Sequence, residues 1–259
     1  MTPRNVARRA WARVAAALCL APVVLAPVVV LGQEAPLPSG RTVVERHVAA
    51  IGGEAAFRGI ESIRVRGRFV INGREVSAEF EQLAARPNRL RVRAEIAGVG
   101  RTEQGYDGTI AWMIDPQGGA RLLTDRERAE VVADADFDGP LHLPDRVASL
   151  TTLGRVTFDG RPAYRVKVVL ASGVEQDEYF DVESGLQLGW EAQRATPLGI
   201  VPTTAFLRDY AKFGPLLQPR TLVQKALHVE QVLRVTSVEY NVVSDAAFDA
   251  PQEIQALAR

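Results

Sequence analysis

Residues 60–98 read IESIRVRGRFVINGREVSAEFEQLAARPNRLRVRAEIAG, and their pattern decides the fold. Apolar and polar residues alternate along three runs of this stretch, and turn-forming residues separate the runs. Alternation with a period of two over such lengths predicts antiparallel strands with one face in water and one against apolar material. The stretch therefore predicts three successive strands that share a charged face and an apolar face.

The Asn72-Gly73 pair between the first two runs favours a two-residue type I′ hairpin, which fixes the expected register. This register pairs charge with charge and apolar with apolar: Arg66 with Glu79, Arg64 with Glu81, Phe69 with Val76, and Val65 with Phe80. Glutamates oppose the arginines, and no aromatic platform is interleaved with them. We therefore interpret this face as solvated and expect no nucleic-acid partner.

The N-terminus has the layout of a secretory signal. Four arginines precede an apolar run over residues 14–31, and no acidic residue occurs before Glu34. We therefore expect a signal peptide over residues 1–32, a linker over 33–40 and one domain over 41–259.

Single residues bear on three alternatives to a general secretory signal: a membrane anchor, a lipoprotein signal and a twin-arginine signal. Pro22 and Pro27 weaken a helix in the apolar run, which disfavours the alternative of an uncleaved membrane anchor. The large Leu18 before Cys19 argues against lipidation. The Arg8-Arg9 pair leaves twin-arginine export open beside general secretion.

The composition suits an ordinary globular chain of 259 residues, 47% of them hydrophobic and 24% charged. The single cysteine lies inside the predicted signal, so the exported part has no disulfide and is held by its core alone. Thiol chemistry and cysteine metal sites are excluded on the same ground. We expect no cofactor and no metal.

A helix is expected over residues 41–51, where Val44, Val48 and Ile51 share one face and Gly52-Gly53 ends the helix. His47 lies beside this stripe. We interpret it as a half-buried packing residue, because no second histidine or carboxylate lies one turn away in a metal-binding arrangement.

Two further elements follow the first strands. Residues 110–114 form a strongly apolar strand with poor alternation, which predicts that Trp112 is a core or cavity-wall residue. Residues 122–135 predict a helix that is capped by Thr124, with Glu127 three residues further on.

Residues 134–150 imitate the spacing of an EF-hand calcium loop, with aspartates at positions 134, 136, 138 and 145. Pro140 and Pro144 interrupt this spacing, and the closing ligand is an aspartate where bidentate binding needs the longer glutamate. We therefore favour an irregular loop in which Phe137, Leu141 and Leu143 turn inward.

Residues 151–242 are again nearly all strand, which brings the expected total to about eleven, and residues 251–258 predict a final short helix. Strands joined mostly by short turns predict a mainly β fold, a half-open antiparallel sheet that curls into an unclosed barrel. A few short helices cannot cover so wide an apolar concave face, and the surplus suggests a cavity for a hydrophobic ligand. We expect the cavity wall to include Val65, Phe69, Phe80, Leu90, Val92, Ile96, Trp112 and Trp190.

Several motifs occur in a characteristic order: Gly52-Gly53 after the first helix, then RPNRLR (86–91), GYDG (105–108) with Trp112, FDGPL (137–141), DGRPAY (159–164) and YFD (179–181). In this order the chain resembles the outer-membrane lipoprotein-sorting family, the LolA-like relatives of the lipoprotein carriers LolA and LolB. The resemblance covers most of the chain after the predicted signal, about residues 41–250.

This resemblance implies a half-open barrel whose concave apolar face receives acyl chains of lipoproteins or lipids in the periplasm. Helices and a mobile lid loop would partly plug the concave face, and Phe137, Leu141 and Leu143 would belong to the lid. The lid-locking arginine of the carriers cannot be matched to one position, because arginines occupy almost every outward site of the first strands.

The leading hypothesis is therefore a periplasmic carrier that shields acyl chains from water and exchanges them with transport partners at the inner and outer membranes. Without a lipobox, a soluble shuttle is favoured over a membrane-tethered acceptor. The alternative is a lipid or envelope-stress sensor or scaffold of the same fold, which binds a partner protein and does not transport. An enzyme is disfavoured, because the chain has three histidines, no Gly-x-Ser-x-Gly elbow and no cluster with metal spacing.

Overall fold

The chain forms a thirteen-stranded antiparallel sheet that begins and ends at its centre, where the first strand pairs with the last. The computed structural model describes residues 36–71, 74–196 and 199–259. The predicted signal peptide, the start of the predicted linker and the Asn72-Gly73 turn lie outside the described residues. Residues 37–259 belong to one compact unit.

The strands alternate with short turns along most of the chain. They are β1 (Ser62–Ile71), β2 (Arg74–Ala85), β3 (Arg89–Ile96), β4 (Gly100–Tyr106), β5 (Ala111–Asp115), β6 (Gly119–Leu122), β7 (Val147–Phe158), β8 (Arg161–Leu170), β9 (Glu175–Asp181), β10 (Gln187–Thr196), β11 (Gly199–Phe213), β12 (Leu216–Ala226) and β13 (Val229–Tyr240). The helices are α1 (Gly40–Ala50), α2 (Glu54–Arg58), α3 (Asp125–Asp134) and α4 (Gln252–Leu257), with two 3₁₀ turns, η1 (Gly139–Leu141) and η2 (Asp245–Phe248).

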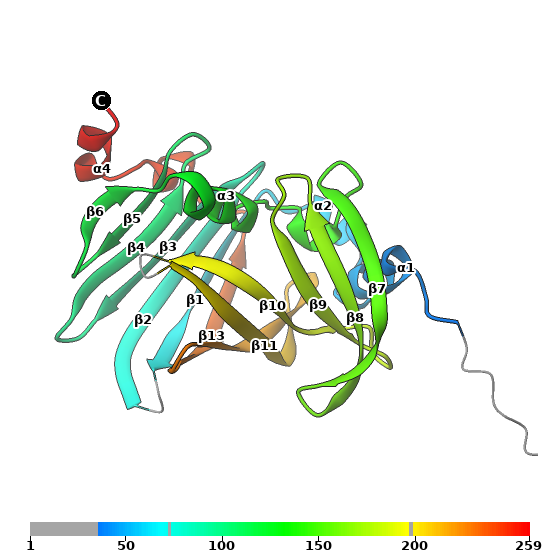
Figure 1. The fold of residues 1–259 in the computed structure, drawn as a ribbon. Coiled ribbons are helices and arrows are strands. Elements are labelled where there is room, and N and C mark those ends of the chain that lie inside the picture. Colours follow the sequence, from blue (N-terminus) through cyan, green and yellow to red (C-terminus); the bar gives the residue numbers. More distant parts are fainter. Residues whose placement is uncertain (1–35, 72–73, 197–198) are drawn as a thin grey trace, which may run out of the picture. The chain divides into compact units, whose positions relative to one another are not determined.

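The order of strands in the sheet is β6-β5-β4-β3-β2-β1-β13-β12-β11-β10-β9-β8-β7. From the central β1 the chain meanders outward to the edge strand β6, crosses to the opposite edge strand β7, and meanders back to the centre (Figure 1). The edge strands β6 and β7 do not pair with each other, so the curled sheet stays open. The predicted mainly β, half-open architecture is confirmed.

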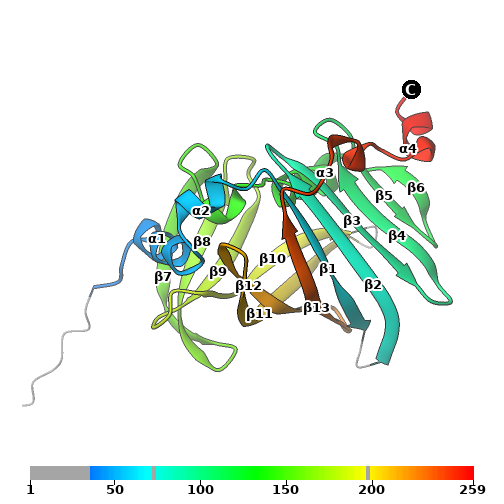
Figure 2. The ribbon, with the colours of Figure 1, turned by 180° about the vertical axis from the view of Figure 1, so that it is seen from behind.

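The helices lie on both sides of this sheet. On the concave side α1 packs against β7, β8 and β9, where Val44, Val166 and Phe180 are buried together. Also on this side, α3 reaches from β4 and β5 to β10. The C-terminal segment with η2 and α4 passes over the opposite, convex side of β2–β6 (Figure 2). There Phe248 packs on Leu83 and Ala85 of β2.

The register of the first hairpin differs from the predicted one. Near the turn Ile71 pairs with Arg74 as expected, but a bulge between Phe69 and Ile71 shifts every earlier pair by two residues. Phe69 therefore pairs with Ala78, Arg66 with Glu81, and Val65 with Gln82. A shift of two residues leaves each side chain on its predicted face, because the side-chain period of a strand is two.

Two strands were not predicted from the sequence, and one predicted helix cap does not form. The structure has thirteen strands where about eleven were expected, because β4 and β6 are glycine-containing and polar and show little alternation. The predicted helix over residues 122–135 begins at Asp125, since Leu122 ends β6. Thr124 occupies the N-cap position without a side-chain cap bond, and Glu127 pairs instead with Arg121 at 2.7 Å.

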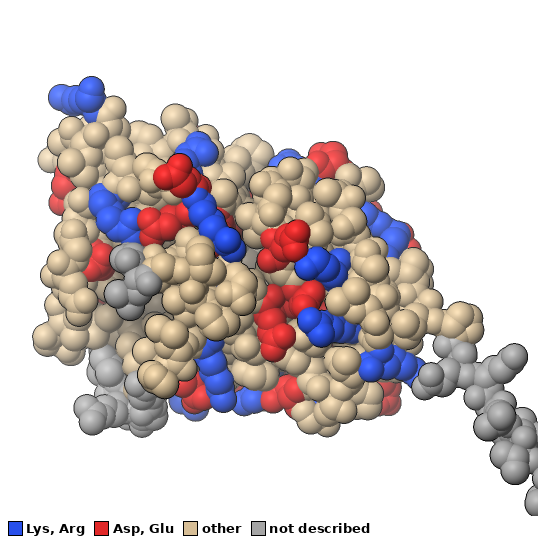
Figure 3. Space-filling view, viewed as in Figure 1, with Lys and Arg blue, Asp and Glu red and all other residues tan. Residues whose placement is uncertain are grey.

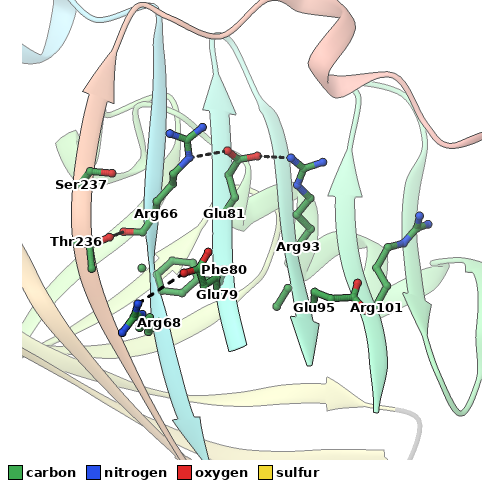
Figure 4. Close-up of a pocket in the computed structure, with 12 residues that line it drawn as sticks. Arg66, Arg68, Glu79, Phe80, Glu81, Arg93, Glu95, Arg101, Thr236 and Ser237 are labelled. Carbon is green, nitrogen blue, oxygen red and sulfur yellow. Dashed lines mark hydrogen bonds and ion pairs between the residues drawn. The ribbon is translucent and has the colours of Figure 1, made fainter. Parts of the chain in front are cut away.

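The charged face of β1–β3 is the convex face, and its charges neutralise one another across strands (Figure 4). Glu81 accepts from Arg66 at 3.0 Å and from Arg93 at 2.7 Å, and it lies 3.7 Å from Arg64. Each such exposed pair adds little stability, so the network of charged side chains mainly keeps this face solvated.

Within the described residues, no helix is both long enough and apolar enough to cross a membrane.

Trp112 supplies a test of the packing on the convex side. Its ring is fully buried over Gly105, where an added Cβ would lie 2.3 Å from the ring. We predict that Gly105→Ala lowers the free energy of unfolding by about 1–3 kcal/mol, because the tryptophan cannot move aside in a packed cluster. Urea denaturation measures this loss.

Gly154→Ala in β7 is the matched control, because nothing lies within 4 Å of the Cβ it would gain. Its free energy of unfolding should stay within about 0.5 kcal/mol of wild type. Equal effects at the two positions would contradict the described packing of Trp112.

Candidate functional site

Two mainly apolar cavities lie on the concave face of the described part of the sheet, and we call them the outer and the inner cavity. The outer cavity has a volume of about 910 Å³, within the size range of ligand pockets. It lies between the concave face of β1–β5 and the hairpins of β10–β11 and β12–β13. Apolar side chains form most of its wall: Phe69, Phe80, Val92, Ala94, Ile96, Met113, Val201, Leu227, Val229 and Leu233.

The strand period explains this wall. Phe69, Phe80 and Val92 occupy alternating positions of adjacent strands, so all three face the concave side. Leu227 and Val229, at the tip of β12–β13, remain 63% and 46% exposed. Uncharged side chains cover the surface over the β10–β11 hairpin, whereas charged ones gather over β8 and β9 (Figure 3). The outer cavity is thus an apolar hollow with an apolar rim.

The inner cavity, of about 330 Å³, lies among α1, α2, the segment after α3, and strands β1, β2 and β10–β13. Its apolar wall includes Ile51, Phe57, Ile60, Ile63, Ala84, Phe137, Leu207 and Leu216. Its polar lining includes His47, Gln82, Gln187, Tyr210 and Tyr240. Burial raises the pKa of Tyr210, and the Tyr210 hydroxyl donates to the Gln187 carbonyl at 2.8 Å.

The segment of residues 135–146, which we call the crossing loop, covers the inner cavity and connects α3 to β7. Phe137 and Leu141 of this loop are buried in an apolar cluster with Phe57 and Leu216, and Leu143 packs against that cluster. The predicted inward orientation of these three side chains is confirmed. Phe137 also lines the inner cavity.

Arg86, at the end of β2, holds the crossing loop to the sheet. Its guanidinium pairs with Asp138, donates to the Ile60 carbonyl at 2.8 Å, and lies 4.9 Å from the centre of the Phe137 ring. It also donates to the Phe57 carbonyl at 3.2 Å, so one side chain joins α2, β2 and the loop. Oδ2 of the Asp138 carboxylate is therefore paired with an arginine.

His142 forms a second attachment of the crossing loop. Its Nε2 lies 3.0 Å from Glu178 of β9, and both side chains are buried. Burial lowers the pKa of His142, but the charge of Glu178 and their hydrogen bond outweigh burial and raise it above 6.5. Burial likewise raises the pKa of Glu178, yet His142 and Gln176 bring it below 4.5. Each partner therefore favours the charged form of the other.

The helix α3 is tied to β10 on the other side of the concave face. Arg194 of β10 pairs with Asp134 and lies 3.6 Å from Glu130. Glu130 is itself buried and accepts from the Ala195 amide at 3.0 Å, while Arg126 donates to the Gln193 carbonyl at 2.7 Å. These polar contacts fix the helix over the sheet.

The predicted wall residues separate into three groups. Phe69, Phe80, Val92 and Ile96 line the outer cavity. Val65 packs against the Phe69 and Phe80 cluster, and Leu90 is buried on the same face beneath α3 with Tyr106 and Val131. Trp112 and Trp190 line neither cavity.

Trp112 is a core residue, one of its two predicted places, and does not belong to the wall of either cavity. Trp112 points to the convex side, where it packs with Ile254 of α4, and its Nε1 donates to the buried Glu103 at 3.3 Å. Trp190 lies on the concave face beside Glu178 and Ala205, with the Arg194 guanidinium 5.8 Å from its ring centre.

The inner cavity was missed from the sequence. Its wall combines α1 and α2 with β11–β13, segments about 150 residues apart, and only the tertiary fold brings them together. Leu207 and Tyr210 of β11 both line the cavity, but they are three residues apart, so the two-residue period of a strand gives no signal for this wall. His47, expected to be half-buried, is 4% exposed and belongs to this wall.

The sequence matches no protein-family model and no curated protein. The fold, in contrast, is similar to solved structures. A LolA-superfamily protein from Nitrosomonas europaea superposes with a TM-score of 0.55 at 12% identity, over 83% of this chain and 99% of that one. A DUF1329-family protein from Desulfovibrio piger superposes with a TM-score of 0.54 at 13% identity, over 82% of this chain and 98% of that one.

An outer-membrane lipoprotein-sorting protein domain from Vibrio parahaemolyticus gives a TM-score of 0.51 at 10% identity, over 81% of this chain and 96% of that one. At these identities the likeness concerns the fold alone. The chain has the LolA-like fold, as its motif order suggested.

We predict that Arg86→Met loosens the crossing loop. Amide hydrogens of residues 137–142 should exchange at least tenfold faster than in wild type, because several charge-assisted bonds to the loop and α2 are lost. Hydrogen–deuterium exchange with mass spectrometry measures the rate.

Arg58→Met is the control, because Arg58 makes an exposed ion pair with Glu54 on α2. It should leave the exchange of the loop unchanged. Unaltered exchange in Arg86→Met would show that Arg86 does not hold the loop.

Raising the pH should weaken the attachment through His142. Because the pKa of His142 is raised above 6.5, its stabilisation is complete below pH 6.5 and is lost as the pH rises through the raised pKa. The difference in melting temperature between wild type and Glu178→Gln should therefore be largest near pH 6 and shrink toward alkaline pH.

His228→Gln removes an exposed histidine of the β12–β13 turn and should follow the wild-type pH profile. Parallel profiles for wild type and Glu178→Gln would contradict the charge coupling of His142 and Glu178.

Proposed function

We propose that this protein is a carrier of the bacterial periplasm, which binds acyl chains of lipoproteins or other lipids on its concave face. One observation carries the proposal: the outer cavity, about 910 Å³ and mainly apolar, is left uncovered by the helices. Each methylene group moved from water into such a cavity contributes about 0.8 kcal/mol. An extended chain can lie along Phe69, Phe80 and Val92.

Three further features support the proposal. The fold is that of LolA-superfamily and lipoprotein-sorting proteins, although the likeness itself concerns the fold alone. The N-terminal sequence has the layout of an export signal. The crossing loop is held by polar contacts of Arg86 and His142 in addition to the burial of Phe137 and Leu141. Such a loop can act as a lid.

Transport also requires delivery and release. Under this proposal, acyl chains pass to and from partners at the inner and outer membranes, and the apolar rim at Leu227 and Val229 marks the mouth for that exchange. Phe137, Leu141 and Leu143 form the inner surface of the lid. The arginines of the convex face have no part in binding the chain.

Filling the outer cavity tests the proposal. Ala94 of β3 lines this cavity, and Ala94→Phe should weaken binding of the fluorescent fatty acid cis-parinaric acid by about tenfold or more. A phenyl ring displaces at least two methylene groups of the ligand, each contributing about 0.8 kcal/mol. A fluorescence titration of delipidated protein gives the dissociation constant.

Ala148→Phe makes the same exchange at an exposed alanine of β7 and should leave the affinity unchanged. Native mass spectrometry of protein purified from bacterial envelopes should show bound lipid. Lipid-free protein that also takes up no cis-parinaric acid would overturn the proposal.

A further inference from the structure

The wall of the outer cavity turns from apolar to polar toward the open edge of the sheet at β6. One cross-strand row on the concave face runs from Val92 of β3 through Gln104 of β4 to Arg121 of β6. Thr102 lies two residues before Gln104, so the two side chains share this face. Both are half-buried and line the outer cavity. The cavity is therefore amphipathic, which suits an amphipathic ligand.

A smaller, polar cavity of about 140 Å³ adjoins this part of the wall. Glu127 and Glu130 of α3 and Arg194 of β10 contribute to its lining. Gln104 lines both cavities. The Gln104 side chain thus lies at the junction of the apolar hollow and a polar one.

The charged side chains around this junction are already paired. Within the described residues, each charged side chain of the two cavity walls has an ion-pair or hydrogen-bond partner: Arg93, Glu103, Asp115, Arg121, Glu127, Glu130 and Arg194. Arg121 and Glu127, for example, form two hydrogen bonds of 2.7 and 2.9 Å. A ligand with a charged head would therefore be desolvated without gaining a counter-ion.

Thr102 and Gln104, in contrast, make no side-chain hydrogen bond within the described part of the chain. The Thr102 hydroxyl and the Gln104 amide are uncharged, and both can donate. Two other glutamines line the outer cavity, but Gln117 lies in an exposed turn and Gln231 lies beside the exposed tip of the β12–β13 hairpin. Thr102 and Gln104 are thus two uncharged donors directly beside the apolar wall.

We propose that Thr102 and Gln104 bind the uncharged carbonyl group of an amphipathic ligand, an ester or an amide. The apolar chain of this ligand lies along Val92 and Phe80. This inference rests on the proposed function and adds to it a subsite for the polar head. A carbonyl oxygen has two lone pairs and can accept from both side chains. A few polar groups placed in an apolar pocket fix the orientation and the specificity of a ligand in this way.

Isothermal titration calorimetry with four ligands at neutral pH tests the subsite. In 1-methoxydecane a methylene group replaces the carbonyl of methyl decanoate, N-methyldecanamide carries the amide, and decanoate carries a charge. Wild type should bind the ester or the amide about three- to tenfold more tightly than the ether, because the ether lacks the carbonyl. The tighter of the two identifies the ester or the amide as the source, and decanoate should bind more weakly than that ligand.

Three variants assign the preference to these side chains. Gln104→Leu removes the amide at similar volume and should lose most of the preference, whereas Thr102→Val removes one hydroxyl and should lose part of it. Gln252→Leu, at an exposed glutamine of α4, is the control and should keep the wild-type preference. Circular dichroism melts establish that the variants fold, and the comparison of ligands on wild type needs no variant. A preference of wild-type size in Gln104→Leu would overturn the assignment.

The two proposals fail in different ways. An affinity of wild type for the ether that equals or exceeds those for ester and amide would overturn this inference and leave the carrier function standing. Tighter binding of decanoate than of both carbonyl ligands, or binding of cis-parinaric acid without binding of any of the four ligands, would do the same. Absence of binding by all five compounds would overturn both.

Discussion

The pairing of β1 with β13 is the constraint on which the rest of the structure depends. It joins the first and last strands at the centre of the sheet and sends the two meanders outward in opposite directions. The edge strands β6 and β7 are consecutive in the chain yet lie at opposite ends of the sheet. The segment between them must therefore pass across the concave side, and α3 with the crossing loop is that segment.

This crossing determines where the cavities lie. Polar contacts attach the segment, among them Arg194 with Asp134, Arg86 with Asp138, and His142 with Glu178, and the segment buries Phe137 and Leu141 in the core. It covers only part of the concave face. The apolar side chains that remain outside its cover form the outer cavity, and those beneath the loop form the inner one. The same polar attachments that complete the fold are thus the contacts that opening the site would break.

The sequence was sufficient to predict strands that have one face in water. In β1–β3 most alternate residues are charged, so both the strands and the side of Phe69, Phe80 and Val92 follow from the period alone. The same reasoning failed for register, since nothing in the sequence around Val70 marks the bulge that shifts Phe69 from Val76 to Ala78. The face of Trp112 depends on α4, whose packing is a long-range contact that alternation does not encode.

The concave apolar face is the central claim, and photochemical labelling tests it most directly. A fatty acid with a diazirine near its methyl end, irradiated with the protein and mapped by mass spectrometry, should attach to residues of the outer cavity. Phe80, Val92 and Met113 are the expected positions, with Phe137 expected if the chain reaches the inner cavity. Labelling confined to the convex face, around Arg64, Arg66 and Glu81, would contradict the account.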